Sequence, residues 1–216
     1  MRPRLINPVR AVLRQLIGDL EFAVVSNNCW GAHVYQALAL PYATPFVGLF
    51  IPPDSYLRLL GNFDALIRSE LSFIATSAIA GLNAMRQRDG LTYPIAMLGG
   101  EVELHFLHYS DQAEAAHKWT RRVTRMPAEP ARYFFKFDDR ESASTEQIAQ
   151  FCAMPLANKV CFTARAYGVA TVLAPAEAGA GHVIDGLSLG QVSRKYFNAL
   201  RWISSRPRWM PLPSLV

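Results

Sequence analysis

The sequence contains few cysteines. Cys29, Cys152 and Cys161 form no CxxC pair and have no zinc-like spacing with histidine. This odd, sparse count favours a reducing compartment over a disulfide framework. A chain of 216 residues can bury a sizeable core without such cross-links. We therefore expect a single domain over residues 1–216.

Long apolar runs are also absent. The uncharged run at residues 71–85 is shorter than the roughly 20 residues that a membrane span needs. The basic N-terminus lacks the uninterrupted apolar stretch of a secretory signal. These absences favour a cytoplasmic protein that does not span a membrane.

The chain has no Gly-x-Gly-x-x-Gly motif, no Walker loop and no Gly-x-Ser-x-Gly elbow, which argues against common nucleotide-binding and serine-hydrolase designs. Its net charge of +5 is concentrated at residues 2–14 and 194–208, so we do not expect a nucleic-acid partner. A basic, aromatic C-terminal helix is expected at about 189–205. We favour tryptophans packed on the core and solvated arginines, with peripheral contact to the inner membrane as the alternative.

Short apolar segments alternate with helical patterns along the chain. Two glycines at 99–100 indicate a β-hairpin. We predict an α/β fold with a mixed, mostly parallel sheet, helices on both faces (three-layer α/β/α) and one β-hairpin. The expected strands are 22–25, 46–51, 93–98, 101–109, 132–137, 159–163 and 170–173. The expected helices are 9–20, 32–38, 55–71 with an extension to 85, 111–126, 144–152 and 189–204.

The motif SNNCWG, residues 26–31, lies between an expected strand and an expected helix. The N-terminus of a helix offers unpaired N–H groups and partial positive charge, which suit an anion and favour the thiolate form of Cys29. The asparagines can donate hydrogen bonds to a carbonyl, a phosphate or a sugar hydroxyl. The alternative is structural, with the asparagines as turn caps and Cys29 and Trp30 as packing residues. The candidate binding residues here are Ser26, Asn27, Asn28, Trp30 and Gly31.

This motif, together with residues 45–50, 103–109 and 159–163, resembles a bacterial family classed as a domain of unknown function. Some of its members are labelled exopolysaccharide biosynthesis proteins. The resemblance implies an α/β fold and a link to surface glycans. This chain departs from the family pattern at Ala32, where a second glycine is usual, and at residues 141–142, where Asp-Gly is typical. Either departure is compatible with a different ligand.

His105 and His108 have a His-x-x-His spacing. On a strand, residues three apart face opposite sides of the sheet, so a shared metal ion is not expected. His105 and Tyr109 would share a face. We interpret one histidine as a general base or hydrogen-bond donor and the other as hydrogen-bonded within the fold. We expect His108 and Tyr109 to lie nearest the end of the strand, where functional sites are commonly found.

A third polar cluster, Asp138, Asp139 and Arg140, follows another apolar strand. If that strand runs parallel to residues 22–25, both motifs emerge at one edge of the sheet, where open α/β sheets bind ligands. The alternative is a loop cap beside an exposed ion pair. Arg122, on the helix after His108, is a candidate for anion binding, although a solvated arginine is favoured.

The leading hypothesis is a group transferase that acts on a glycan, a glycan precursor or another activated anionic small molecule. Cys29 would be the nucleophile or an anion contact, and Asn27 and Asn28 would be donors. His108, or else His105, would be the base, oriented by Asp138 or Asp139. A non-catalytic carbohydrate- or partner-binding subunit is the alternative, with stacking on Trp30 and Tyr109. Metal-dependent hydrolysis through His108 and Asp138 or Asp139 is a third option. The cofactor is left open.

Overall fold

The computed structural model describes residues 8–140, 143–192, 195–207, 210 and 212. Its larger sheet is parallel with the strand order β1-β5-β6-β7, formed by Ala23–Ser26, Tyr133–Asp138, Lys159–Thr163 and Val172–Leu173. A smaller antiparallel sheet has the order β2-β3-β4, formed by Leu71–Ile74, Ile95–Leu98 and Val102–His105. The predicted α/β class with a mostly parallel sheet is confirmed.

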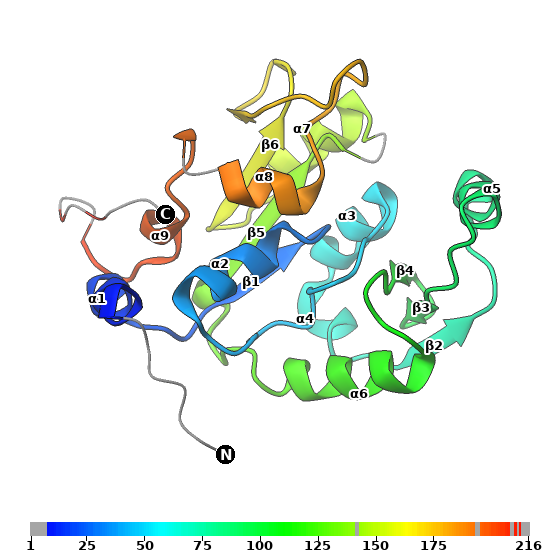
Figure 1. The fold of residues 1–216 in the computed structure, drawn as a ribbon, viewed down its shortest axis with the longest axis horizontal. Helices are drawn as coiled ribbons and strands as arrows, with labels where there is room; N and C mark the ends of the chain where they lie inside the picture. Colours follow the sequence, from blue (N-terminus) through cyan, green and yellow to red (C-terminus); the bar gives the residue numbers. More distant parts are fainter. Residues whose placement is uncertain (1–7, 141–142, 193–194, 208–209, 211, 213–216) are drawn as a thin grey trace.

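Alternating side chains of the parallel strands face two separate cores, as expected where both faces of a sheet are covered. One core joins Val24, Phe134 and Phe162 to α1 (Pro8–Ile17), α2 (Trp30–Leu38), α8 (Gly186–Val192) and α9 (Ala199–Ile203). The other joins Val25, Phe135 and Phe137 to α3 (Pro53–Gly61) and α7 (Thr145–Ala153). Figure 1 shows α2 and α8 together over one face of this sheet, with α1 and α9 at one end of the molecule.

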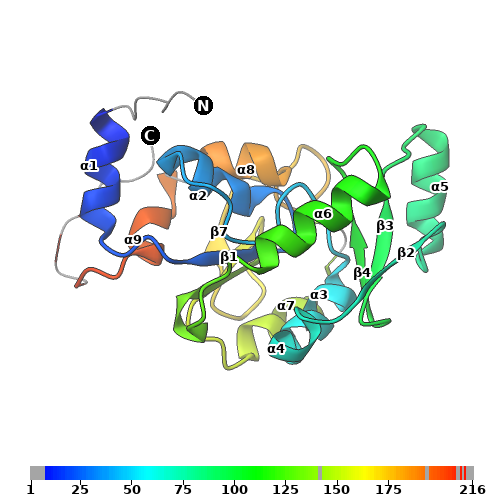
Figure 2. The ribbon, with the colours of Figure 1, turned by 90° about the horizontal axis from the view of Figure 1, so that it is seen from below.

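The hairpin lies in the smaller sheet, which the sequence did not predict as a separate unit. Gly99 and Gly100 both have positive φ, of 62° and 71°, and they reverse the chain between β3 and β4. The helix α5 (Ala80–Arg88) lies beyond this sheet, at the end of the molecule opposite α1 (Figure 2). The helix α6 (Gln112–Val123) begins at Asp111, whose carboxylate accepts the Glu114 N–H at 2.7 Å.

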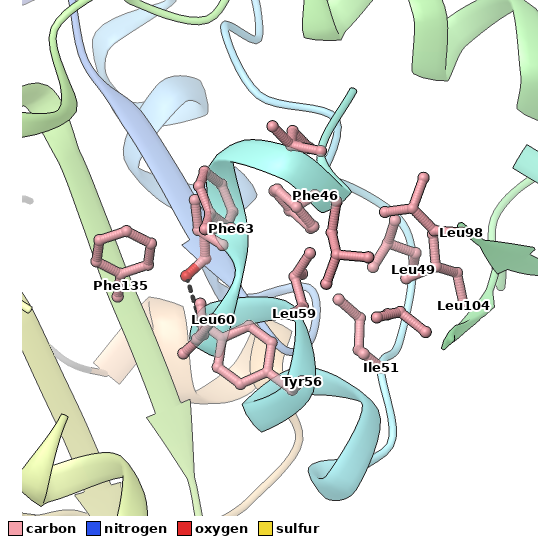
Figure 3. Packing of buried hydrophobic residues seen from close by; sticks show 14 of the residues in the cluster. Phe46, Leu49, Ile51, Tyr56, Leu59, Leu60, Phe63, Leu98, Leu104 and Phe135 are labelled. Atoms are coloured by element: carbon pink, nitrogen blue, oxygen red, sulfur yellow. Dashed lines mark hydrogen bonds between the residues drawn. The ribbon is translucent and has the colours of Figure 1, made fainter. Parts of the chain in front are cut away.

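Residues 46–51 join the two sheets. Predicted as a strand, they instead form a single bridge, in which Phe50 and His105 exchange backbone hydrogen bonds at 2.9 Å. The next residue, Ile51, donates its N–H to the carbonyl of Asn27 at 2.9 Å. Figure 3 shows Phe46, Leu49 and Ile51 between the side chains of α3 and those of Leu98 and Leu104. The core beside α3 therefore continues into the smaller sheet.

Two predicted helices were wrong in extent. The helix expected over 55–85 ends at Gly61 and is followed by α4 (Phe63–Leu66), and residues 71–74 form β2, because Leu71 and Phe73 alternate onto the core. The helix expected over 189–204 is divided into α8 and α9, and the Asn198 side chain caps α9 by accepting the Arg201 N–H at 2.9 Å. Trp202 packs on the core as predicted. Trp209 lies outside the described residues.

Within the described part of the chain, no helix is long and apolar enough to cross a membrane.

Candidate functional site

A buried polar network connects the carboxyl ends of β1 and β5. The Asn27 and Asn28 side-chain amides donate to the two oxygens of Asp138, at 3.1 Å and 2.8 Å. Lys136 Nζ donates to the side-chain oxygens of Asn27, at 3.2 Å, and Asn28, at 2.9 Å, and it also pairs with Asp138. Because β1 and β5 are parallel, both polar motifs do emerge at one edge of the sheet, as predicted.

Lys136 is fully buried, yet its surroundings fit the charged form. An ammonium has three N–H donors and no acceptor, and three acceptor oxygens surround Nζ. Burial lowers the pKa of Lys136, and the Asp138 carboxylate opposes this shift. A negative charge on Cys29 would add a smaller effect in the same direction, so a Cys29 thiolate and the Lys136 ammonium would stabilise each other.

Sequence reasoning missed Lys136. The available signal was a lysine in the middle of the apolar strand 133–138, where a charge needs a partner. Asp138, two residues later, lies on the same face of that strand and is the obvious partner.

A cavity of about 540 Å³ lies beside this network. Segments that follow the ends of three strands contribute to it, through Cys29 after β1, His108 after β4 and Arg140 after β5. Ala32 also lines it, whereas residues 141–142 lie outside the described residues. The full lining is Asn28, Cys29, Ala32, Gln36, Tyr42, Val47, Gly48, Phe50, Leu107, His108, Arg140, Asp185, Gly186 and Leu187.

Cys29 is half-buried at the N-cap position of α2, a helix of nine residues. The start of α8 packs directly against this turn. A Cβ added to Gly186 would lie 2.6 Å from Asn28 Oδ1 and 3.0 Å from the Trp30 nitrogen. The contact leaves no room for a side chain at Gly186, so α8 fixes the position of the turn that carries Cys29.

The two candidate histidines have different surroundings. His108 is exposed, lines the cavity and donates its backbone N–H to the Gly48 carbonyl at 3.0 Å. His105 is fully buried, with Nε2 2.6 Å from Glu103 Oε1 and Nδ1 3.2 Å from the Tyr93 hydroxyl. Burial lowers the pKa of His105, although Glu103 opposes the shift. The structure therefore places His108 at the cavity and His105 in an internal network of the smaller sheet.

The strand predicted over 101–109 ends at His105, so the expected shared face of His105 and Tyr109 was wrong. Phe106 donates its N–H to the Pro94 carbonyl, and the chain then turns. Tyr109 is buried, and its hydroxyl donates to the Val47 carbonyl at 2.6 Å. It therefore offers no stacking surface to a ligand.

Arg122 is buried rather than solvated, which corrects the favoured interpretation. Its Nη1 donates to the Tyr109 hydroxyl at 2.6 Å, and its guanidinium stacks over the Tyr42 ring at 5.1 Å. Since Tyr42 lines the cavity and Arg122 does not, Arg122 supports the cavity wall from behind.

The remaining residues of the SNNCWG motif are buried. Trp30 is fully buried against Phe162 and Trp202, so the proposed stacking of a sugar on Trp30 is wrong and the packing alternative holds. Ser26 accepts the Asn28 N–H at 3.5 Å, and a side chain at Gly31 would lie 3.1 Å from the Ser26 Cβ. Asn27 is fully buried within the polar network, whereas Asn28 reaches the cavity.

Asp139 and Arg140 organise the connections after β6 and β7. The Asp139 carboxylate accepts backbone N–H groups of Ala164 and Val183, both at 2.8 Å. Arg140 donates to Glu177 Oε2 at 3.1 Å and to the Val183 carbonyl at 3.0 Å. Arg140 is thus held at the cavity wall, while Asp139 is turned toward the neighbouring loops.

Among the residues that the structure describes, no group of three or more histidine, cysteine, aspartate or glutamate side chains is placed to hold a metal ion. The two carboxylates considered for a metal-dependent reaction, Asp138 and Asp139, accept hydrogen bonds within the protein.

The fold and the site define an α/β protein with a ligand-sized cavity beyond the carboxyl ends of its strands. The chain belongs to the family described as Domain of unknown function (DUF1919), whose model matches residues 6–200. It is also 31% identical over 159 residues to an uncharacterized protein of Haemophilus influenzae, over 74% of this chain and 69% of that protein. The predicted membership of a domain-of-unknown-function family is confirmed, and the link to exopolysaccharide stays a prediction.

Proposed function

We propose that this protein is a group transferase that acts on a glycan or a glycan precursor in the synthesis of bacterial surface polysaccharide. The observation that carries the proposal is that Cys29 and His108 line the same cavity, whose Asn28 is hydrogen-bonded to the buried Lys136 ammonium. A thiol and an imidazole at one cavity supply a nucleophile and a general base.

In this reaction Cys29 attacks the activated donor as a thiolate, favoured by the N-terminus of α2 and by Lys136. The thiol proton passes to His108 as the thiolate forms. The donated group bonds to sulfur as the bond to the leaving group breaks, and His108 gives that proton to the leaving group. His108 then takes the proton of an acceptor hydroxyl, whose oxygen displaces the thiolate. Asp138 is a positioning residue, since it acts through Asn28.

Arg140 offers guanidinium N–H donors at the cavity wall to an anionic donor, with its charge partly offset by Glu177. Its bonds to Glu177 and the Val183 carbonyl fix its position before a ligand arrives. The glycan acceptor is proposed from the resemblance to proteins labelled for exopolysaccharide biosynthesis.

The test is to incubate the protein with a panel of activated donors and to measure the mass of the peptide that contains Cys29. We expect a donor-derived adduct on Cys29 that an oligosaccharide acceptor removes. The variant Cys29→Ala should form no adduct and lose transfer, and Cys152→Ala should retain both. Transfer by Cys29→Ala at the wild-type rate would remove the nucleophile role.

A non-catalytic carbohydrate-binding subunit is a second candidate. It is favoured by the Tyr42 ring, which lines the cavity and is held by Arg122. This candidate predicts saccharide binding that Tyr42→Ala weakens and Cys29→Ala does not, with no adduct from any donor.

A further inference from the structure

The wall of the cavity is mostly apolar. Its hydrophobic residues are Ala32, Tyr42, Val47, Phe50, Leu107 and Leu187, and its polar residues are Asn28, Gln36, His108, Arg140 and Asp185. Leu107 is 37% exposed and Leu187 is 49% exposed. Large hydrophobic side chains with this exposure are few in the described part of the chain, and these two face the same cavity. An apolar surface gathered in this way marks a binding site.

The apolar part of this wall suits a hydrocarbon group better than a sugar ring. Sugar hydroxyls placed against leucine and valine side chains would lose water without gaining hydrogen bonds, which is unfavourable. Each methylene of an acyl chain buried there would instead tighten binding about fourfold. The thiol of Cys29 lies in the same cavity, so a chain on this wall has its carbonyl end within the site that holds the nucleophile.

We propose that the group transferred is an acyl chain, which lies along the apolar wall while its carbonyl is attacked by Cys29. This inference rests on the proposed function and specifies its donor, an acyl ester or acyl thioester. The thiolate bonds to the carbonyl carbon, the carbon–oxygen or carbon–sulfur bond to the leaving group breaks, and His108 protonates the leaving group. The acceptor hydroxyl, deprotonated by His108, then attacks the Cys29 thioester and releases the thiolate.

The test uses alkyl methanethiosulfonates, which convert a thiol to a mixed disulfide and release methanesulfinate. Rates of modification by the methyl and butyl reagents are measured at Cys29 in the protein and in a short unstructured peptide with the sequence of residues 26–31, by mass spectrometry. The peptide has no cavity and serves as the control, whereas Cys152 does not, because Phe151, Val160 and Val172 line its own cavity. We expect the ratio of butyl to methyl rates to be at least fivefold higher at Cys29 in the protein than in the peptide.

Two variants locate the effect. Leu107→Ser with Leu187→Ser should bring the ratio at Cys29 to that of the peptide. Leu173→Ser should keep the wild-type ratio, because Leu173 is 59% exposed and does not line the cavity. Thermal unfolding of each variant checks that the fold is intact.

A ratio at Cys29 that equals the ratio of the peptide, or a raised ratio that persists in the double variant, would overturn the acyl proposal. If Cys29 still reacted rapidly with the methyl reagent, the transferase proposal would survive with another donor. Absence of reaction at Cys29 with either reagent would overturn both proposals.

Discussion

Lys136 donates a hydrogen bond to the side-chain oxygen of Asn28 at 2.9 Å, across a sequence separation of 108 residues. The bond links the middle of β5 to the turn that carries Cys29. It makes the buried charge of β5 part of the candidate site, because Asn28 also lines the cavity. The polar network and the cavity are therefore one structural unit.

The first prediction concerns the stability of this unit. Lys136→Met leaves the Asp138 carboxylate buried without its cationic partner, and we expect the free energy of unfolding to fall by about 3–5 kcal/mol. Adding Asp138→Asn removes the unpaired charge and keeps an acceptor oxygen, so the double variant should recover part of the loss. Urea unfolding at pH 7 measures both. A single variant within about 1 kcal/mol of wild type would contradict the assigned charge pair.

The second prediction concerns the contact between α8 and the SNNCWG turn. Gly186→Ala would place a Cβ 2.6 Å from Asn28 Oδ1, so we expect a loss of about 1–3 kcal/mol in the free energy of unfolding. Gly81→Ala is the matched control, because nothing lies within 4 Å of its added Cβ and Gly81 is in α5. That variant should gain about 0.5–1 kcal/mol. If Gly186→Ala and Gly81→Ala changed the free energy of unfolding equally, the contact between α8 and the SNNCWG turn would not disfavour a side chain at Gly186.

The third prediction concerns acid stability. Burial lowers the pKa of His105 below its ordinary value of 6.5. Burial would raise the pKa of Glu103, but hydrogen bonds from Ser77, Ala78 and His105 outweigh it and bring the pKa below 4.5. In both cases the unfolded chain binds more protons than the folded chain at pH values between the lowered pKa and the ordinary pKa. The free energy of unfolding therefore falls as the pH drops through this range.

We expect the loss from His105 to begin below pH 6.5 and the loss from Glu103 below pH 4.5. Urea unfolding at a series of pH values from 7 to 4 measures it. His105→Gln should flatten the dependence between pH 6.5 and 4.5, whereas His117→Gln, at an exposed position on α6, should leave it unchanged. A wild-type slope in His105→Gln would contradict the role given to His105.

Local signals predicted much of the fold. The strand–turn–helix unit of residues 22–38 and the hairpin at Gly99 and Gly100 follow from patterns within a few residues, and both are present. The helix expected at 144–152 is also present as α7, and Ser144 caps it by accepting the Gln147 N–H at 3.2 Å.

Features that depend on distant contacts were not predictable. The strand β2 exists because Leu71 and Phe73 meet a core built by α3 and the hairpin. Trp30 looked like a ligand contact from its motif, but the aromatic residues that bury it, Phe162 and Trp202, are far away in the sequence. Likewise, only the parallel pairing of β1 with β5 brings Asn28 to Lys136.

The reactivity of Cys29 tests the central claim, that its thiolate form is stabilised, and the comparison requires a suitable reference thiol. The hydrogen bond with the Cys161 thiol lowers the pKa of Cys152 to about 7, so Cys152 is not an ordinary reference thiol in a pH series. A short unstructured peptide with the sequence of residues 26–31 provides the reference instead. Cys152→Ser simplifies the measurement on the protein.

The decisive measurement is the rate of Cys29 alkylation by iodoacetamide as a function of pH, read by peptide mass spectrometry. The account predicts that Cys29 reacts rapidly well below the reference thiol pKa of about 8.5, at which the peptide is half ionised. A Cys29 rate no higher than that of the peptide at every pH would contradict the account, and the cavity would then be better explained as a binding surface.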